Sequence, residues 1–312
     1  MDFLGIIFGI VLLSHGGDLL TKSSVDISLK FSVPKIIIGM TVVSFATSAP
    51  ELIVSLNAAI EGFPSFALGN VLGSNIANMG LVLGILCVIY PVTLKPRFYS
   101  SDFPIMMIST ILFFIFIYTG SSISRLEGIL LLISIVVILA YLFLYQKNSI
   151  SEFSEEIDLH KISIFRSFFY IIFSGFLLWL GSETLIKSAI NVANKFQISE
   201  RVISISMVAL GTSIPELAAS IVASLKKQND LSIGNLIGSN IFNLLVVLGV
   251  TSTILPIENI DSKIIFSDMI WVIAFSFIIF PLAYFKKKNV LSRKKGIILL
   301  VLYLAFIIPL FS

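Results

Sequence analysis

Charged residues are scarce in this sequence: Asp, Glu, Lys and Arg together make up 12% of its 312 residues, against roughly 25% in soluble globular proteins. Hydrophobic residues make up 57%. This balance excludes a water-soluble domain, and it excludes intrinsic disorder, which requires low hydrophobicity and high net charge. Because one bilayer span takes about 20 apolar residues, the composition predicts an all-α polytopic membrane protein.

Cysteine and histidine are almost absent. Cys87 is the only cysteine, and the two histidines, His15 and His160, lie far apart in the sequence. An intramolecular disulfide, a haem, an iron–sulfur cluster and a zinc site are therefore excluded, and we expect no cofactor. An intramembrane protease would need paired aspartates, a Ser/His arrangement or HExxH, and none is evident, so we expect no enzyme.

Apolar runs bounded by charges, proline or glycine predict ten spans, at roughly 3–20, 35–59, 66–90, 102–119, 125–145, 164–186, 200–225, 231–254, 265–285 and 295–311. The first run has no basic n-region and no small-residue cleavage site, so we interpret it as a retained span. Alternate loops hold 16 and 5 of the 21 Lys and Arg residues. By the positive-inside rule the richer loops are cytoplasmic, which puts both termini outside a cell membrane. The same loop cations explain the net charge of +3, so we expect the lipid bilayer as a partner, no nucleic acid and no obligatory protein partner.

The chain contains an internal repeat. When it is shifted by 165 residues, positions 46–84 align with 211–249 without a gap, and 17 of 39 residues are identical. Each half then holds five spans, and an odd number forces the second copy to enter the membrane the opposite way round. We therefore predict two inverted five-helix repeats, at 1–145 and 164–312, joined by a short cytoplasmic linker at 146–163. Inverted repeats are typical of secondary transporters, whose substrate binds near the midplane between equivalent interrupted helices.

Two acidic residues lie in the middle of predicted spans. Glu51 and Glu216 each follow a proline in the repeated motif T-S-x-P-E. An ionised group at the bilayer centre costs several kcal/mol, so such residues are by default functional. The prolines, Pro50 and Pro215, remove an intrahelical hydrogen bond and free a carbonyl one turn back, near Ala46 and Gly211. The alternative is a protonated glutamate that is hydrogen-bonded in helix packing, but it would have to occur twice at equivalent positions.

A second repeated motif, G-N-x-x-G-S-N-I-x-N, adds amides and hydroxyls: Asn70, Ser74, Asn75 and Asn78, then Asn235, Ser239, Asn240 and Asn243. Any single hydroxyl could instead bond back to its own helix. The motif glycines, Gly69 with Gly73 and Gly234 with Gly238, indicate close helix packing. Two carboxylates among neutral oxygens, without imidazole or thiolate, favour hard cations such as Ca²⁺ and Na⁺. Competition of both ions for the same carboxylates would couple their transport.

At these residues the sequence resembles the sodium/calcium exchangers of the calcium/cation antiporter superfamily, whose α-repeats carry the G-T-S-x-P-E and G-N-x-x-G-S-N-x-x-N patterns. The resemblance covers essentially the whole chain and implies ten helices, with helices 1 and 6 sliding over a site between helices 2, 3, 7 and 8. It implies Na⁺/Ca²⁺ antiport by alternating access, electrogenic because family members move more than two Na⁺ per Ca²⁺. The metal ligands that it implies are Glu51, Glu216, Thr47, Ser48, Thr212, Ser213, Ser74, Ser239, Asn78, Asn243 and the main-chain carbonyls of Ser44 and Ala209.

The sequence departs from the family pattern in two places. Ala46 replaces the first glycine of G-T-S-x-P-E, beside the kink. Asn243 stands where some relatives, including potassium-dependent exchangers, have aspartate, so we expect exchange that is independent of K⁺. The G-N-x-x-E motif of proton-coupled calcium exchangers is absent, which weakens that alternative. A channel is the other alternative; it would conduct without a counter-ion, and inverted halves around enclosed carboxylates disfavour it.

Two oppositely charged pairs lie near span ends at one-turn spacing. Asp18 and Lys22 in the first repeat align with Glu183 and Lys187 in the second. Side chains four residues apart on a helix face one another. We expect both pairs to be structural.

Overall fold

The computed structural model describes residues 2–145, 163–195, 211–258, 260–262, 264–284 and 289–311. Nearly all of the predicted linker, the first part of the predicted span 200–225 and Ala209 lie outside these residues. The first half contains α1 (Asp2–Phe31), α2 (Lys35–Ile38), η1 (Gly39–Val43), α3 (Ser44–Ile60), α4 (Pro64–Ala77), η2 (Asn78–Val82), α5 (Leu83–Ile89), β1 (Val92–Thr93), η3 (Phe98–Asp102), α6 (Phe103–Gly120) and α7 (Arg125–Tyr145). The second half contains α8 (Ile164–Lys195), α10 (Ile214–Leu225), α11 (Asn229–Phe242), η5 (Asn243–Val247), α12 (Leu248–Ile254), η6 (Ile264–Asp268), α13 (Met269–Tyr284), β2 (Val290–Leu291), α14 (Arg293–Ile307) and η7 (Ile308–Phe311).

Eight helical segments of the described chain are long and apolar enough to cross a membrane, by length and composition. Several of them are continuous helices that contain one wider π-helical turn, such as α4 with η2 and α5. The segments match the predicted spans within a few residues at most ends. Two shorter helices, α10 with 12 residues and α14 with 15, overlap the two remaining predicted spans, 200–225 and 295–311.

Two helices extend well past their predicted ends. The predicted spans stop at residues 20 and 186, whereas α1 continues to Phe31 and α8 to Lys195. The charges that suggested those ends are paired one turn apart: Lys22 contacts Asp18, and Lys187 contacts Glu183, each at 2.7 Å. The pairing confirms the expected ion pairs, and it explains why the charges do not end the helices.

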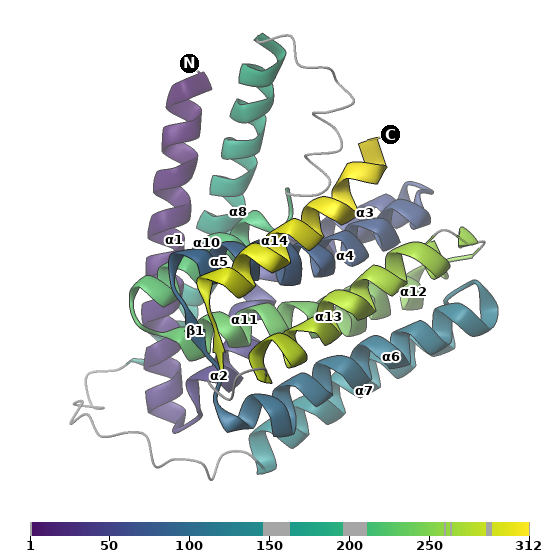
Figure 1. Ribbon diagram of the computed structural model, residues 1–312, viewed down its shortest axis with the longest axis horizontal. Helices are drawn as coiled ribbons and strands as arrows, with labels where there is room; N and C mark the ends of the chain where they lie inside the picture. Colours follow the sequence, from purple (N-terminus) through teal and green to yellow (C-terminus); the bar gives the residue numbers. More distant parts are fainter. Residues whose placement is uncertain are drawn as a thin grey trace.

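The two long helices pack against each other as an antiparallel pair. A Cβ atom on Gly9 of α1 would lie 2.9 Å from the carbonyl oxygen of Gly181 of α8, and one on Gly181 would lie 3.0 Å from that of Gly9. Only glycine allows this approach. Gly16 lies beside Leu178, so residue numbers rise along α1 as they fall along α8. The pair stands upright in Figure 1 and crosses the oblique run of the other helices.

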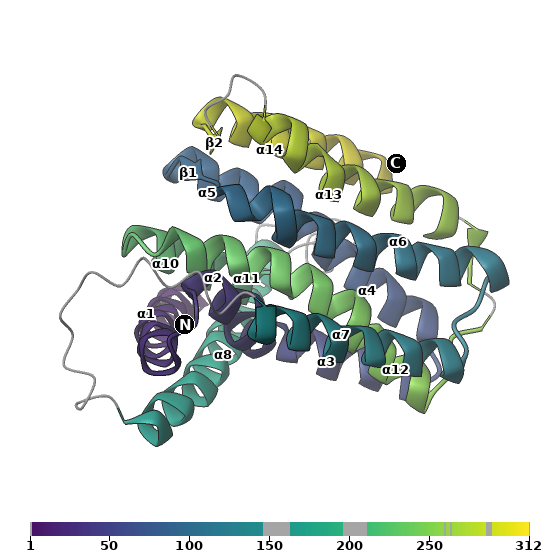
Figure 2. The same cartoon turned by 90° about the horizontal axis from the view of Figure 1, so that it is seen from below.

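The other helices extend to one side of this pair. Figure 2 looks nearly along α1 and shows them in rows, with α14 and α13 on one face and α3, α7 and α12 on the opposite face. The most deeply buried are α4 to α5 and α11 to α12, whose most apolar stretches are 72% and 83% buried. These central helices carry the repeated asparagine motif.

The two halves of the chain interlock through equivalent contacts. Gly84 of α5 packs on Gly296 of α14, and Gly249 of α12 packs on Gly128 of α7. The β1 strand pairs with β2 through Val92 and Leu291. A single bridge joins Ile123 to Ile257, which is 165 residues after Val92. The segment after α5 thus pairs with the segment before α14, and the segment after α12 pairs with the segment before α7.

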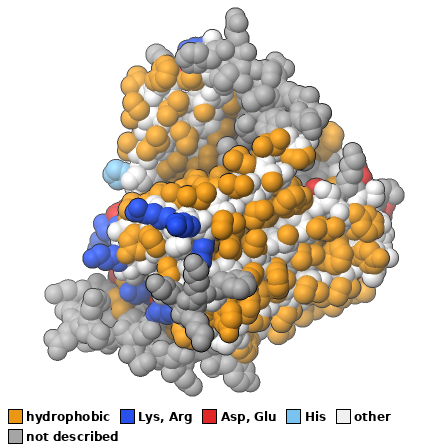
Figure 3. Space-filling view, in the orientation of Figure 1, with side chains coloured by type: hydrophobic (Ala, Val, Ile, Leu, Met, Phe, Trp, Pro, Cys, Tyr) orange, Lys and Arg blue, Asp and Glu red, His pale blue; other side chains and the backbone are white. Residues whose placement is uncertain are grey.

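The surface is mostly apolar. Figure 3 shows hydrophobic side chains over the face formed by α13 and α14, with Lys and Arg gathered toward one end. Arg293 and Lys294, at the start of α14, are exposed. A soluble monomer seldom exposes so much contiguous apolar surface. This face is suited to contact with lipid tails.

Candidate functional site

The two central glutamates are fully buried in the interrupted helices. Glu51 lies in α3 directly after Pro50, which sits inside the helix. Glu216 lies in the first turn of α10 directly after Pro215. The sequence predicted that each proline removes an intrahelical hydrogen bond and frees a carbonyl one turn back. In the structure α3 continues through Pro50, with the π-helical turn η1 before it, and a turn at residues 211–213 precedes α10.

Each glutamate is hydrogen-bonded through one oxygen only. The hydroxyl of Ser48, in the first half, donates to Oε1 of Glu216 at 3.1 Å. The hydroxyl of Ser74 donates to Oε1 of Glu51 at 3.2 Å, and its oxygen lies 3.2 Å from that of Ser213 in the second half. Oε2 of both glutamates is buried and has no hydrogen-bond partner among the described residues. Within the described part of the chain, two carboxylate oxygens are thus left without a donor.

The asparagines form a reciprocal network across the two halves. Asn75 and Asn240 donate their side-chain amides to each other's carbonyl oxygen, at 3.1 and 3.2 Å. Asn78 donates to Oδ1 of Asn240 at 3.2 Å, and Asn243 donates to Oδ1 of Asn75 at 3.1 Å. These bonds use the amide nitrogens of Asn78 and Asn243 and leave their Oδ1 atoms buried and without a partner in the described structure.

Both of these asparagines begin a π-helical turn. The wider turn η2 starts at Asn78, and η5 starts at Asn243. Single π-helical turns inside α-helices occur frequently at functional sites. The sequence indicated the asparagines but not the wider turns, because no local pattern distinguishes a π turn from the α-helix around it.

The threonines of the T-S-x-P-E motif contact the other half. Thr47 donates to Oδ1 of Asn235 at 3.1 Å and lies 3.4 Å from the hydroxyl of Ser239. Its equivalent, Thr212, donates to Oδ1 of Asn70 at 3.5 Å and is only half-buried. The structure therefore brings both threonines to the buried amides, one more closely than the other.

Two further serines complete this layer. Ser55 accepts a bond from the amide of Asn70 at 3.0 Å, and Ser220 accepts one from Asn235 at 3.1 Å. Sequence reasoning did not single out these serines. The available signal was their identity in both repeats, four residues after each glutamate.

The predicted carbonyl ligands are only partly described. The carbonyl oxygen of Ser44 accepts a bond from Thr47 at 3.3 Å, while the Ser44 hydroxyl bonds back to Met40 at 2.8 Å. Ala209 lies outside the described residues. The carbonyl of Gly211 accepts a bond from Ser182 of α8 at 3.1 Å, so this freed carbonyl faces a long helix.

The glycines of the asparagine motif behave differently in the two halves. A Cβ on Gly234 would lie 3.0 Å from Cα of Gly39, and Gly238 abuts the backbone of Met40. The predicted close packing is confirmed for this pair. For Gly69 and Gly73 no described atom lies within 4 Å of such a Cβ.

The described residues form a buried polar centre in which the atoms without a partner are all acceptors. They are Oε2 of Glu51 and Glu216 and Oδ1 of Asn78 and Asn243, two equivalent pairs from opposite halves. Among the described residues, no Lys or Arg forms an ion pair with either glutamate. A buried acceptor without a donor costs about 1–3 kcal/mol. The centre is suited to hold cations.

The comparisons with known proteins match this architecture. The sequence matches the family described as sodium/calcium exchanger protein over residues 1–144 and 166–311, which is nearly all of the chain. The chain belongs to this family. Its members are transporters of the calcium/cation antiporter superfamily, and the chain is a multi-pass membrane protein of that kind.

Relatives and solved structures cover most or all of the chain. It is 28% identical to the sodium/calcium exchanger MaX1 of Methanosarcina acetivorans, over all of this chain and 99% of that protein. It is 32% identical to the inner membrane protein YrbG of Escherichia coli, over 81% of this chain and 80% of that protein. A structure of the sodium-calcium exchanger NCX_Mj, soaked with zero Na⁺ and Ca²⁺, superposes with a TM-score of 0.82 at 27% identity and covers 98% of both chains.

Proposed function

We propose that the protein is a secondary active antiporter that exchanges Na⁺ for Ca²⁺ across a cell membrane. The observation that carries this proposal is the pair of fully buried glutamates, one from each half, each with an oxygen that has no partner among the described residues, in a centre of neutral acceptors. Oxygen-only surroundings select hard cations, and two carboxylates balance one divalent ion. The solved relative, a sodium-calcium exchanger of the same fold, supports the identity of both ions.

The ligands that we propose are the two glutamates and the oxygens around them. Glu51 and Glu216 bridge overlapping Ca²⁺ and Na⁺ sites, and the unpartnered Oδ1 atoms of Asn78 and Asn243 face the same ions. The further oxygens come from Thr47, Ser48, Thr212, Ser213, Ser74, Ser239, Ser44 and Ala209. The serines that already donate to Oε1 keep the carboxylates oriented when the ions leave.

Coupling then follows from charge. Both ions compete for the same two carboxylates, so one occupant excludes the other. More than two Na⁺ per Ca²⁺ makes the exchange electrogenic, and asparagine rather than aspartate at position 243 makes it independent of K⁺.

The architecture that we propose has ten spans in two inverted five-helix repeats, residues 1–145 and 164–312, with both termini outside and the linker 146–163 cytoplasmic. The antiparallel course of the equivalent helices α1 and α8 supports the inversion, as do the equivalent contacts Gly84–Gly296 and Gly128–Gly249. Access alternates as α1 and α8 slide across the site. The exposed apolar surface of both helices is compatible with such movement.

The experiment that tests this function is an isotope flux assay in proteoliposomes with imposed Na⁺, K⁺ and H⁺ gradients. We expect a Na⁺ gradient to drive ⁴⁵Ca²⁺ uptake, and K⁺ or pH gradients alone to be ineffective. Uptake driven only by the pH gradient would favour the alternative, a proton/calcium antiporter. Calcium flux without any counter-ion gradient requirement would indicate a channel instead.

A further inference from the structure

The two long helices contact the site-bearing helices differently. Gly17 of α1 lies against α10: a Cβ on it would be 3.0 Å from the side chain of Val222 and 3.3 Å from the carbonyl oxygen of Ala218. The residue equivalent to Gly17 in α8 is Ser182, which bonds instead to the carbonyl of Gly211. Thus α1 covers the C-terminal part of α10, whereas the described contact of Ser182 lies at the N-terminal side of α10.

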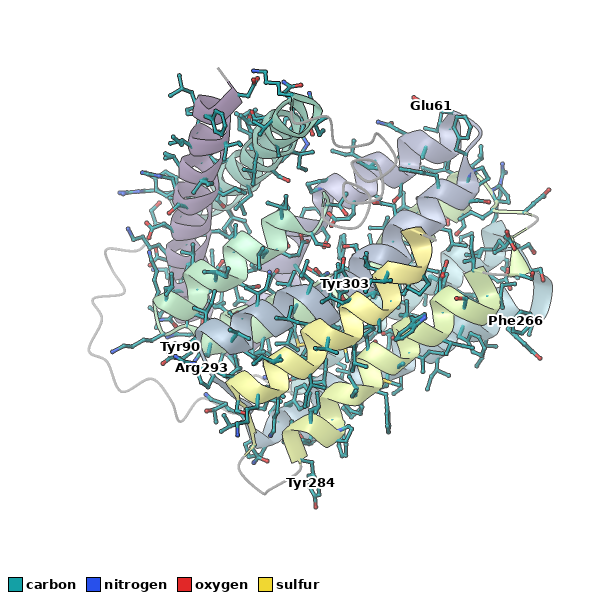
Figure 4. All side chains as sticks on the ribbon, turned by 45° about the horizontal axis from the view of Figure 1, so that its top comes forward. Glu61, Tyr90, Phe266, Tyr284, Arg293 and Tyr303 are labelled. Atoms are coloured by element: carbon teal, nitrogen blue, oxygen red, sulfur yellow. The ribbon has the colours of Figure 1, made fainter. Side chains whose placement is uncertain are left out.

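Burial shows the same asymmetry at equivalent positions of the two site-bearing helices. Val54 of α3 is 36% exposed, whereas its equivalent in α10, Ala219, is 3% exposed. Asn57 of α3 is exposed, whereas its equivalent, Val222, is half-buried. The C-terminal part of α3 is therefore uncovered where that of α10 is covered. In Figure 4 the end of α3 that carries Glu61 projects on the far side of the molecule from α1.

An ion pair joins α1 to the C-terminal end of α10, on the covered side. Asp18 of α1 contacts Lys226, the residue that follows α10, in addition to Lys22. Both side chains are partly shielded, at 39% and 29% exposure for Asp18 and Lys226. The sequence predicted Asp18 and Lys22 as a structural pair and did not indicate the contact with Lys226, because a partner 208 residues away leaves no local pattern.

The loop after α3 has the same turn as the loop after α10, but its first residue carries the opposite charge. Lys227 and its equivalent Gly62 both have positive φ, 59° and 89°, so the loops after α10 and α3 turn alike. Asp18 corresponds to Glu183, which keeps its partner Lys187. Lys226, however, corresponds to Glu61, which is exposed. A glutamate there would repel Glu183, so the mirror-image ion pair cannot form.

We propose that Asp18 and Lys226 are positioning residues that hold α1 against the end of α10 and so favour the conformation in which this side of the site is covered. This inference rests on the proposed function and adds to it a contact that determines which side of the membrane the ion site opens to at rest. In the proposed orientation the covered side is cytoplasmic, because Lys226 belongs to a cytoplasmic loop. Glu61 deprives the opposite conformation of an equivalent contact. The resting protein therefore favours access from outside.

The experiment compares two single-cysteine reporters at equivalent positions. Cys87 is replaced by alanine, and Val222→Cys or Asn57→Cys is introduced. Reaction rates with a small maleimide are measured in permeabilised membranes without Na⁺ or Ca²⁺. In the otherwise native chain we expect Asn57→Cys to react faster. Lys226→Glu should raise the rate at position 222 and lower it at position 57, changing their ratio about two- to fivefold, as suits a partly exposed ion pair.

Matched variants separate this role from a general loss of structure. Lys227→Glu makes the same charge change on the next, exposed residue and should leave the ratio unchanged. The exchanged pair Asp18→Lys with Lys226→Asp should restore it. Adding Glu61→Lys to Lys226→Glu creates the mirror-image pair with Glu183 and should make position 222 the faster site. If Lys226→Glu does not elute as a single species in detergent, Lys226→Gln replaces it.

An unchanged ratio in Lys226→Glu, or rates that rise together at both positions, would overturn the proposal. So would failure of the exchanged pair to restore the ratio. Sodium-driven ⁴⁵Ca²⁺ flux of the native chain is measured in parallel. Absent flux counts against the proposed function whatever the labelling shows, while normal flux with an unchanged ratio counts against the ion pair alone.

Discussion

Asn75 and Asn240 hold each other across the centre of the molecule: each side-chain amide donates to the other residue's main-chain carbonyl, at 3.1 and 3.2 Å. The two residues are 165 positions apart, which is the period of the repeat. Their Oδ1 atoms then accept the amides of Asn243 and Asn78. The pair therefore orients the side chains of Asn78 and Asn243, whose Oδ1 atoms we propose as ion ligands.

Replacing Asn75 should weaken both folding and ion binding. Asn75→Ala removes the donor to the Asn240 carbonyl and the acceptor for Asn243, and each buried group left unpaired costs about 1–3 kcal/mol. We expect a lower melting temperature in detergent and weaker ⁴⁵Ca²⁺ binding. Asn240→Ala should have a similar effect, because the contacts are reciprocal. Unchanged binding in both variants would show that the network does not orient the ligands.

An added charge at position 243 should make the protein depend more on calcium for stability. In Asn243→Asp, a carboxylate oxygen replaces the amide that donates to Asn75 at 3.1 Å, so two acceptors oppose each other. The variant should melt at a lower temperature without ions, and saturating Ca²⁺ should raise its melting temperature more than that of the native protein, since binding stabilises only the folded state.

Asn243→Ala is the matched control for this prediction, because it loses the same donor without adding charge. Its calcium-induced rise in melting temperature should be smaller than that of the native chain. If Ca²⁺ raises the melting temperature of both variants equally, the charge at position 243 does not interact with the bound ion.

A buried ion pair outside the site should be important for stability alone. Asp102 is fully buried and accepts a bond from Nε of Arg97 at 3.2 Å. Removing one partner leaves a buried charge and typically costs about 3–5 kcal/mol. Asp102→Ala should therefore lower the melting temperature strongly, while the double variant Arg97→Met with Asp102→Leu should recover much of the loss. A double variant less stable than the single one would contradict this account.

Much of the fold was predictable because membrane spans and repeats leave local or periodic signals. Eight of the predicted spans correspond to apolar helices of sufficient length, and the family was evident from the two repeated motifs. The predicted ends of the first and sixth spans were wrong, because charged residues near positions 20 and 186 suggested boundaries there. In the structure, Asp18 with Lys22 and Glu183 with Lys187 neutralise those charges within the helix.

The candidate site was predictable in composition but not in arrangement. The sequence identified Glu51 and Glu216, and the structure brings their surroundings together from both halves. It could not show that Ser48 donates to the glutamate of the other half, that π-helical turns begin at Asn78 and Asn243, or that Lys226 contacts Asp18. Each of these depends on how distant segments pack. The roles of the individual ligands remain predictions.

The most direct test of the central claim is sodium-driven ⁴⁵Ca²⁺ flux in proteoliposomes with Glu51→Gln and Glu216→Gln, each compared with Glu258→Gln, which alters an exposed glutamate. Glutamine keeps the size of the side chain and removes the charge that balances the ion. We predict that flux falls to the level of empty liposomes in both site variants and stays near the native rate in the control. Near-native flux in both Glu51→Gln and Glu216→Gln would contradict the claim that these two residues bind the transported ions.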